Sequence, residues 1–311
     1  MSRALTGPIS ESDTGKLVTK TKSTQLFLLV FAALLFWWHP VTATFRLAIS
    51  RDPYTYVLLI LPVSVALIYL ESRDATMVRE SGKWLGAILL ALSILLRIGA
   101  AYTPWLAASG ESLTVSMAAL VIWSIGSVIL CFGLDVFRSL VFPLCFLFLM
   151  VPMPDVAVAW ATDLLQHQSA AASSMLFHLL GVPVISDGVV LSIPGLTIEV
   201  AQECSSIRSS TLLIVMTLIL AQLFLQSWWR KVVLVLLAVP LSILKNGIRI
   251  VTIAELGMHV NPAFLHGRLH RHGGVVFLTI ALLIEITLLW VLRRTEAMPA
   301  SQVATTGTPA E

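Results

Sequence analysis

Residues 209–249 read SSTLLIVMTLILAQLFLQSWWRKVVLVLLAVPLSILKNGIR, and this stretch decides the fold class. It holds two apolar runs, 209–227 and 231–249, each close to the about 20 residues that a helix needs to cross a bilayer. Over the whole chain 57% of residues are hydrophobic and only 12% are charged, whereas soluble domains carry about 25% charged residues. The sequence therefore predicts an all-α polytopic membrane protein that has the bilayer as its solvent.

The same length criterion predicts about eight transmembrane helices. The fifth contains Pro143 and Pro152, which predict a kinked or short helix. Segment 156–181 mixes polar and apolar residues at helical spacing, so it is either an amphipathic helix at the bundle or interface or a ninth, imperfect span. The eight candidate spans are 24–39, 55–71, 84–103, 115–133, 137–153, 209–227, 231–249 and 274–292.

Basic residues that flank the spans predict the orientation, because Lys and Arg concentrate in cytoplasmic loops. With eight spans, Lys and Arg are more numerous in the segments that lie on the same side of the membrane as the N-terminus. Both termini are therefore expected in the cytoplasm. The predicted layout is a polar cytoplasmic segment 1–23, a transmembrane domain 24–292 and a disordered cytoplasmic tail 293–311. Segments 154–208 and 250–273 then lie at the outer face. The net charge of +3 is too small to suggest a nucleic-acid partner.

Residues 182–201 differ from the rest of the chain, because β-branched residues alternate there between turn signals. Those signals are Ser186-Asp187-Gly188 and Pro194-Gly195. They predict a short outer-face β-hairpin or pair of strands directly before Cys204. Of the three cysteines, Cys131 and Cys145 lie in apolar runs and are expected to be small buried hydrophobes.

Cys204 has polar neighbours and begins or caps a predicted helix. The positive end of a helix dipole favours a thiolate nucleophile. Arg208 follows one helical turn later, so it can share the face of Cys204. A small interfacial residue without chemistry is the alternative for Cys204.

A second outer-face cluster lies near the predicted end of the seventh span, where Asn246 precedes Arg249 by three residues. An arginine in apolar surroundings is costly unless it is paired or functional. It offers fixed charge and five donors, which suit an oxyanion or a carboxylate. The alternative is an arginine that reaches to lipid headgroups, and this is the interpretation favoured for Lys245.

The third cluster precedes the eighth span and contains His266, His270 and His272. A histidine there can act as a general acid or base beside the thiol. The three could instead bind a metal, although no HExxH, CxxC or neighbouring carboxylate accompanies them. Together the clusters supply a nucleophile, an anion stabiliser and a proton carrier at one membrane level.

These motifs resemble the exosortase/archaeosortase family of membrane-embedded cysteine transpeptidases. The family pattern is Cys-Ser-Gly-aliphatic-Arg, then Asn-x-aliphatic-Arg, then a His four residues before Gly-aromatic. The corresponding residues are Cys204-Ser205-Ser206-Ile207-Arg208, Asn246-Gly247-Ile248-Arg249 and His270 with Gly274-Val275. Ser206 replaces the family's glycine and Val275 its aromatic residue, and His266 and His272 stay open as alternatives to His270.

The resemblance implies an enzyme of a bacterial inner membrane, with its active site facing the periplasm. Its substrates would be membrane-anchored proteins with a C-terminal sorting signal, made of a short motif, a transmembrane helix and a basic cluster. The implied catalytic residues are Cys204, Arg249 and His270, supported by Arg208 and Asn246, with no cofactor or metal. Exopolysaccharide machinery is an implied partner beside the lipid bilayer.

Two other functions stay open. A non-enzymatic transporter or scaffold would need polar residues inside several spans, and apart from Arg97 strong charges are nearly absent from the centres of the predicted spans. A metal-dependent membrane hydrolase would use His266, His270 and His272, and would be sensitive to chelators but not to thiol alkylation.

Overall fold

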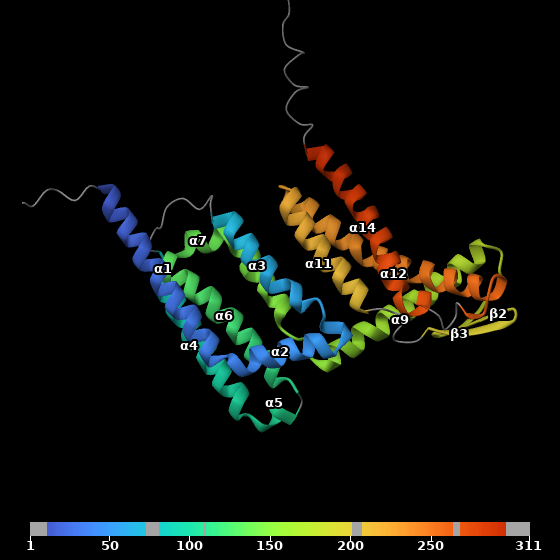
Figure 1. The fold of residues 1–311 in the computed structure, drawn as a ribbon, viewed down its shortest axis with the longest axis horizontal. Coiled ribbons are helices and arrows are strands. Elements are labelled where there is room, and N and C mark those ends of the chain that lie inside the picture. Colours follow the sequence, from blue (N-terminus) through green and yellow to red (C-terminus); the bar gives the residue numbers. More distant parts are fainter. Residues whose placement is uncertain (1–10, 73–80, 109, 201–206, 264–267, 297–311) are drawn as a thin grey trace, which may run out of the picture. The chain divides into compact units, whose positions relative to one another are not determined.

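The long apolar runs form helices, because a helix satisfies its backbone hydrogen bonds within one segment where lipid offers none. The computed structural model describes residues 11–72, 81–108, 110–200, 207–263 and 268–296, with the backbone alone at 11–20, 107–108 and 268–273. Within these ranges six helices are long and apolar enough to cross a membrane, or up to eight if each of two bent pairs is one span. The chain is therefore an all-α polytopic membrane protein with one small sheet (Figure 1).

Contacts divide the chain into two compact units, Met1–Asp155 and Val156–Glu311. In the first unit the closest helix pair is α4 with α6, which glycines allow to approach. A Cβ added to Gly86 would come within 2.7 Å of the backbone nitrogen of Leu130. The elements of this unit are α1 Glu11–Phe36, α2 Trp38–Ser50, η1 Asp52–Tyr54, α3 Val57–Ser72, α4 Lys83–Tyr102, α5 Pro104–Ala108, α6 Ser112–Phe132, α7 Leu134–Ser139, α8 Val141–Phe146 and η2 Leu147–Met150.

The predicted span 24–39 is helical but contains a bend, because the chain turns by 70° between α1 and α2. Pro40 has no N–H to donate to the carbonyl of Phe36, so the hydrogen-bond ladder is interrupted there. Trp37 at the bend is buried and donates its indole N–H to the carbonyl of Ser116, 2.8 Å away. The bend is thus fixed by packing against α6.

The predicted fifth span, 137–153, is short and broken, in agreement with its prolines. Gly133 takes a positive φ of 90° between α6 and α7, and Pro143 lies in the six-residue helix α8. The chain that follows is held by side chains of its own unit. Thr114 donates its hydroxyl to the carbonyl of Pro152 at 2.9 Å, and Tyr54 donates to that of Met153 at 3.0 Å.

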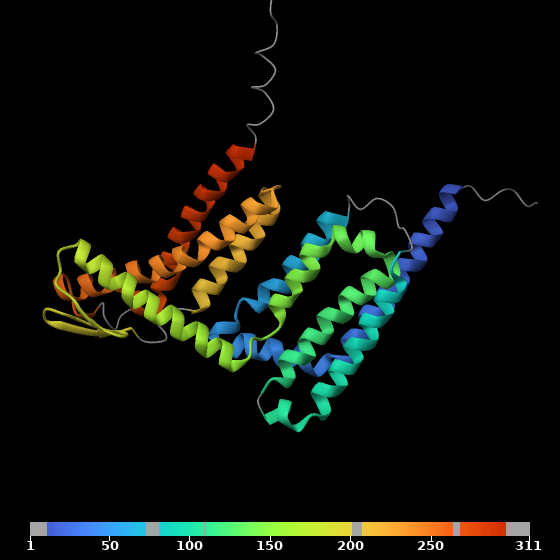
Figure 2. The same cartoon turned by 180° about the vertical axis from the view of Figure 1, so that it is seen from behind.

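The described part of the second unit contains four helices of 18 to 32 residues and the sheet (Figure 2). Helices α11 and α12 pack together and both pack against α14. Leucines on the outside of these helices remain exposed, as lipid-facing side chains do; Leu236 is 63% exposed. The elements are α9 Asp155–Leu179, β1 Ile185–Asp187, β2 Val190–Ile193, β3 Leu196–Glu199, α11 Ile207–Phe224, α12 Trp228–His259 and α14 Arg268–Glu296.

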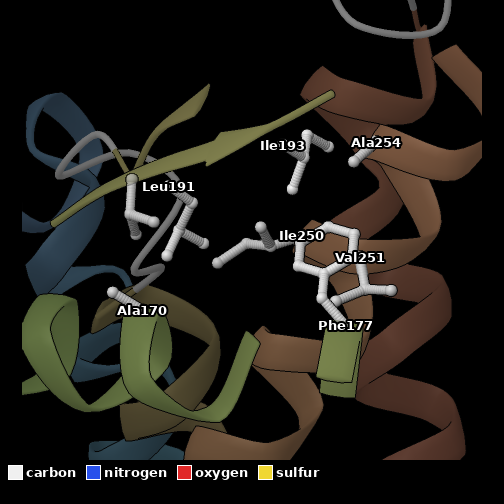
Figure 3. Packing of buried hydrophobic residues seen from close by; sticks show 8 residues of the cluster. Ala170, Phe177, Leu191, Ile193, Ile250, Val251 and Ala254 are labelled. Carbon is white, nitrogen blue, oxygen red and sulfur yellow. The ribbon is translucent and has the colours of Figure 1, made fainter. Parts of the chain in front are cut away.

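The sheet has three antiparallel strands in the order β1-β2-β3, so the expected hairpin gains a third strand. Its two turns fall at the predicted signals, where Gly188 and Gly195 adopt positive φ values of 59° and 84°. Leu191 and Ile193 point from β2 into a buried cluster with Phe177 of α9 and Ile250 of α12 (Figure 3). This cluster ties the sheet to both helices.

Segment 156–181 forms one helix, α9, whose buried residues recur at helical spacing at Ser169, Ala170, Ser173 and Phe177. Its opposite face is exposed, with Trp160 at 69%. The amphipathic pattern therefore reflects packing within the second unit.

Helix α12 is longer than predicted, since it continues past Arg249 to His259. Residues 250–256 contain no glycine or proline that would end the helix. Ile250, Val251 and Ala254 pack in the cluster under the sheet. The prediction that Arg249 lies at a helix end is wrong, because ten further residues are helical.

Candidate active site

Two buried polar residues join the start of α11 to the middle of α12. Lys245 donates a hydrogen bond from its Nζ to the Oγ of Ser209, and the two residues are only 5% and 7% exposed. The expectation that Lys245 reaches to headgroups is therefore wrong. A buried polar group is stabilised only by a partner, and this one fixes the first turn of α11 against α12.

Arg249 lies one helical turn farther along α12 than Lys245. It is 7% exposed, and Asn246 is fully buried at 0%. Helices α11 and α12 run in opposite directions, and Lys245 lies beside Ser209 in the first turn of α11. The residues of α12 that follow Lys245 therefore lie beyond the start of α11. Arg249 thus lies at the end of the unit where α11 begins at Ile207. The structure brings Asn246 and Arg249 together inside the second unit, as their spacing predicted.

The strand that precedes this segment is equally fixed. Val200 is buried at 0%. Its N–H donates to the carbonyl of Val189 at 2.9 Å, and its own carbonyl accepts a hydrogen bond from the amide of Gln166 in α9. Residues 201–206, with Cys204, lie outside the described residues, but Val200 before them and Ser209 after them are both held by other elements.

Small residues let α9 reach α12 beside this site. A Cβ added to Gly247 would lie 3.0 Å from the Cβ of Ala172 and 3.3 Å from the backbone nitrogen of Ser173. Gly247 is the neighbour of Asn246, so the close approach positions the part of α12 that carries the motif. Any larger side chain at 247 must move one helix.

Helix α14 ends where α12 begins. The carboxylate of Glu296 accepts hydrogen bonds from the backbone N–H groups of Gln226 and Ser227, at 3.2 and 2.9 Å, and pairs with Arg230 at 3.3 Å. Residues 293–296, assigned above to the tail, are therefore helical and held by contacts.

The other end of α14 extends beyond the start of α11. The two helices finish at the same end of the unit, and α14 has 29 residues against 18 in α11. The first turn of α14, with the backbone of His270, is therefore at the same end of the unit as Arg249.

The side chains of His270 and His272 and the whole of His266 lie outside what the structure describes, so the choice among the three stays a prediction. Arg208 lies in the first turn of α11 and is exposed.

Basic and aromatic residues mark the opposite end of the three-helix bundle. Arg294 stacks on Trp290 with its guanidinium carbon 3.6 Å from the ring centroid, and Arg230 lies 4.9 Å from that of Trp229. From Lys231 to Arg249 the helix rises by roughly 27 Å at 1.5 Å per residue, against a hydrocarbon core of about 30 Å. Arg249 thus lies about one membrane thickness from the basic end.

One buried ionisable residue escaped the sequence analysis. Glu285 of α14 is 0% exposed, and neither carboxylate oxygen has a hydrogen-bond partner among the described residues. It lies one turn from Ala281 and one turn from Leu289, both buried. Glu285 is thus an exception to the expectation that strong charges other than Arg97 are nearly absent from span centres, and its signal is the single acidic residue in LLIEITLL.

The family model described as Transmembrane exosortase (Exosortase_EpsH) matches residues 37–286. This range covers most of the chain, both units and all three motifs. The chain belongs to the transmembrane exosortase family. It is therefore a multi-pass membrane protein of a transpeptidase family. Neither the search of curated proteins nor that of solved structures found a match.

Proposed function

We propose that this chain is a cysteine peptidase/transpeptidase that cleaves C-terminal sorting signals of exported proteins at the outer membrane face. Family membership supports membrane transpeptidation in general. The observation that carries the finer proposal is the buried pair Lys245–Ser209, with Arg249 one turn beyond it. This arrangement supports the proposal because it holds a buried arginine near the start of α11, the helix that begins three residues after Cys204 in the chain.

The two ends of the bundle support a proposed orientation in the membrane. Trp229, Arg230, Trp290 and Arg294 form an aromatic and cationic belt of the kind found at a cytoplasmic interface. The motif end is then at the periplasmic face of an inner membrane, with both termini inside. A substrate helix with cytoplasmic basic residues would present its motif at the same level.

In the proposed reaction the Cys204 thiolate attacks the carbonyl carbon of the scissile peptide bond, after His270 has taken the thiol proton. The oxyanion of the tetrahedral intermediate is stabilised by the Arg249 guanidinium. The C–N bond then breaks, His270 donates its proton to the leaving amine, and a thioester remains. An acceptor amine or water attacks this thioester and restores the thiol. Arg208 and Asn246 support the site by charge and hydrogen bonding.

The test is cleavage of a co-expressed, C-terminally anchored substrate in cells, comparing the wild type with Cys204→Ser at equal expression. Cys145→Ser is the matched control, because Cys145, which was expected to be buried, is an exposed free thiol in the first unit. We expect Cys145→Ser to cleave and Cys204→Ser not to cleave. Cleavage by Cys204→Ser would place the nucleophile elsewhere.

The histidine-metal hydrolase is the second candidate, and the same assay separates it. Chelators would stop cleavage by that enzyme while thiol alkylation would not. Thiol alkylation is expected to stop cleavage by the enzyme proposed here.

A further inference from the structure

The edge of β3 carries backbone groups with no partner among the described residues. Val200 donates to Val189, and β3 pairs with β2 in register, Leu191 with Ile198 and Ile193 with Leu196. Hydrogen-bonded and non-hydrogen-bonded residues alternate along an antiparallel pair. Thr197 and Glu199 therefore direct their N–H and C=O groups away from β2, toward the open edge.

This edge belongs to a fixed sheet. Leu196 and Ile198 are half-buried against the cluster of α9 and α12, whereas Thr197 and Glu199 are exposed on the outer face. A preformed edge can accept a further strand without reordering, which is how several peptide-binding domains recognise extended segments. The structure thus offers a template for one more strand.

We propose that the recognition motif of the substrate adds to β3 as a fourth strand, in the same direction as β3. The proposal rests on the proposed function. The chain itself passes from β3 through Cys204 into the membrane helix α11, and a sorting signal has the same order of extended motif and helix. A parallel strand would therefore deliver the bond that follows the motif to Cys204.

The two alternatives fit less well. A strand that added to the opposite edge, β1, would be separated from β3 by β2. A second copy of the chain would place the exposed carboxylates of Glu199 near one another, and charged edge residues oppose such pairing. The substrate motif is the occupant that uses the continuity between β3 and Cys204.

Crosslinking in a Cys204→Ala background tests the docking without requiring catalysis. Thr197→Cys and Glu199→Cys are each paired with single cysteines along the substrate motif. We expect disulfides at every second motif residue, with the pattern shifted two residues toward the substrate's C-terminus for Glu199→Cys. Asp187→Cys is the control, because it is exposed on the same face of the sheet but lies in β1.

Three results would overturn the docking site: no crosslink at 197 or 199, equal crosslinking at 187, or disulfides only between two copies of the chain. A shift toward the substrate's N-terminus would overturn the parallel direction. If the expected pattern is found while cleavage is independent of Cys204, the docking stands and the nucleophile is wrong. If cleavage depends on Cys204 without the pattern, the docking is wrong.

Proline substitution gives an independent readout. Thr197→Pro removes an outward N–H and keeps the bonds to β2, and Ser186→Pro makes the same change on the β1 edge. We expect Thr197→Pro to lower cleavage by roughly tenfold or more, since a lost hydrogen bond and a ring at the edge both oppose pairing. Ser186→Pro is expected to cleave normally. Equal cleavage by both variants, at wild-type protein levels, would contradict the proposal.

Discussion

Lys245 of α12 donates a hydrogen bond to Ser209 of α11, and both residues are buried. The bond joins the helix that carries the Asn246–Arg249 motif to the helix that follows Cys204. A lysine in such surroundings is costly without its acceptor, so the pair constrains the relative position of the two helices.

Ser209→Ala leaves the Lys245 amine without this acceptor and is expected to lower the free energy of unfolding by about 1–3 kcal/mol. The double variant Ser209→Ala with Lys245→Met replaces both partners by apolar groups and should recover most of that loss. Thermal unfolding in detergent measures all three proteins. Additive losses in the double variant would show that the two residues do not act as a pair.

Arg249→Lys keeps the positive charge but removes the planar fork of donors. We expect substrate cleavage to fall by roughly 10²-fold, the size seen when one oxyanion donor is lost. The control is Arg138→Lys, whose side chain is 75% exposed. A normal rate in Arg249→Lys would mean that charge alone is needed there.

Gly247→Ala tests the close approach of α9 to α12. The added Cβ meets the Cβ of Ala172 at 3.0 Å, so one helix must shift, at a cost of about 1–3 kcal/mol in unfolding free energy. Gly99→Ala is the matched control, because nothing lies within 4 Å of its added Cβ and alanine favours the helix. Equal melting temperatures for the two variants would contradict the packing described.

Glu285→Leu is expected to stabilise the protein by about 1–3 kcal/mol, because the buried carboxylate has no hydrogen-bond partner in the described part of the chain. Glu285→Gln retains the shape and separates charge from polarity. Melting temperature and substrate cleavage are both measured. A lower melting temperature in Glu285→Leu would show that the carboxylate has a stabilising partner.

Much of the fold could be predicted from local patterns. The apolar runs predicted the spans, Pro143 predicted the broken fifth helix, and Gly188 and Gly195 predicted the two turns of the sheet; the structure contains all three features. The third strand was missed because β1 has only three residues, all exposed, and its pairing with β2 is a tertiary contact.

The candidate site was predictable in its residue types more than in its geometry. The spacing of Asn246 and Arg249 placed them on one helix face, and both are buried together. The sequence could not show that the Lys245 side chain is buried. A lysine near a membrane boundary can either extend to the lipid headgroups or bind a buried partner, and the partner, Ser209, is known only from the structure. The roles of Cys204 and His270 stay predictions.

The proposed mechanism requires Cys204 to form a thioester with the substrate. Mass spectrometry of the chain, isolated during turnover with the acceptor withheld, detects such an adduct. We expect the N-terminal substrate fragment to be attached to the peptide that contains Cys204 and to be released by neutral hydroxylamine. A shortened substrate with no adduct on Cys204, or with an adduct on another residue, would show that Cys204 is not the nucleophile.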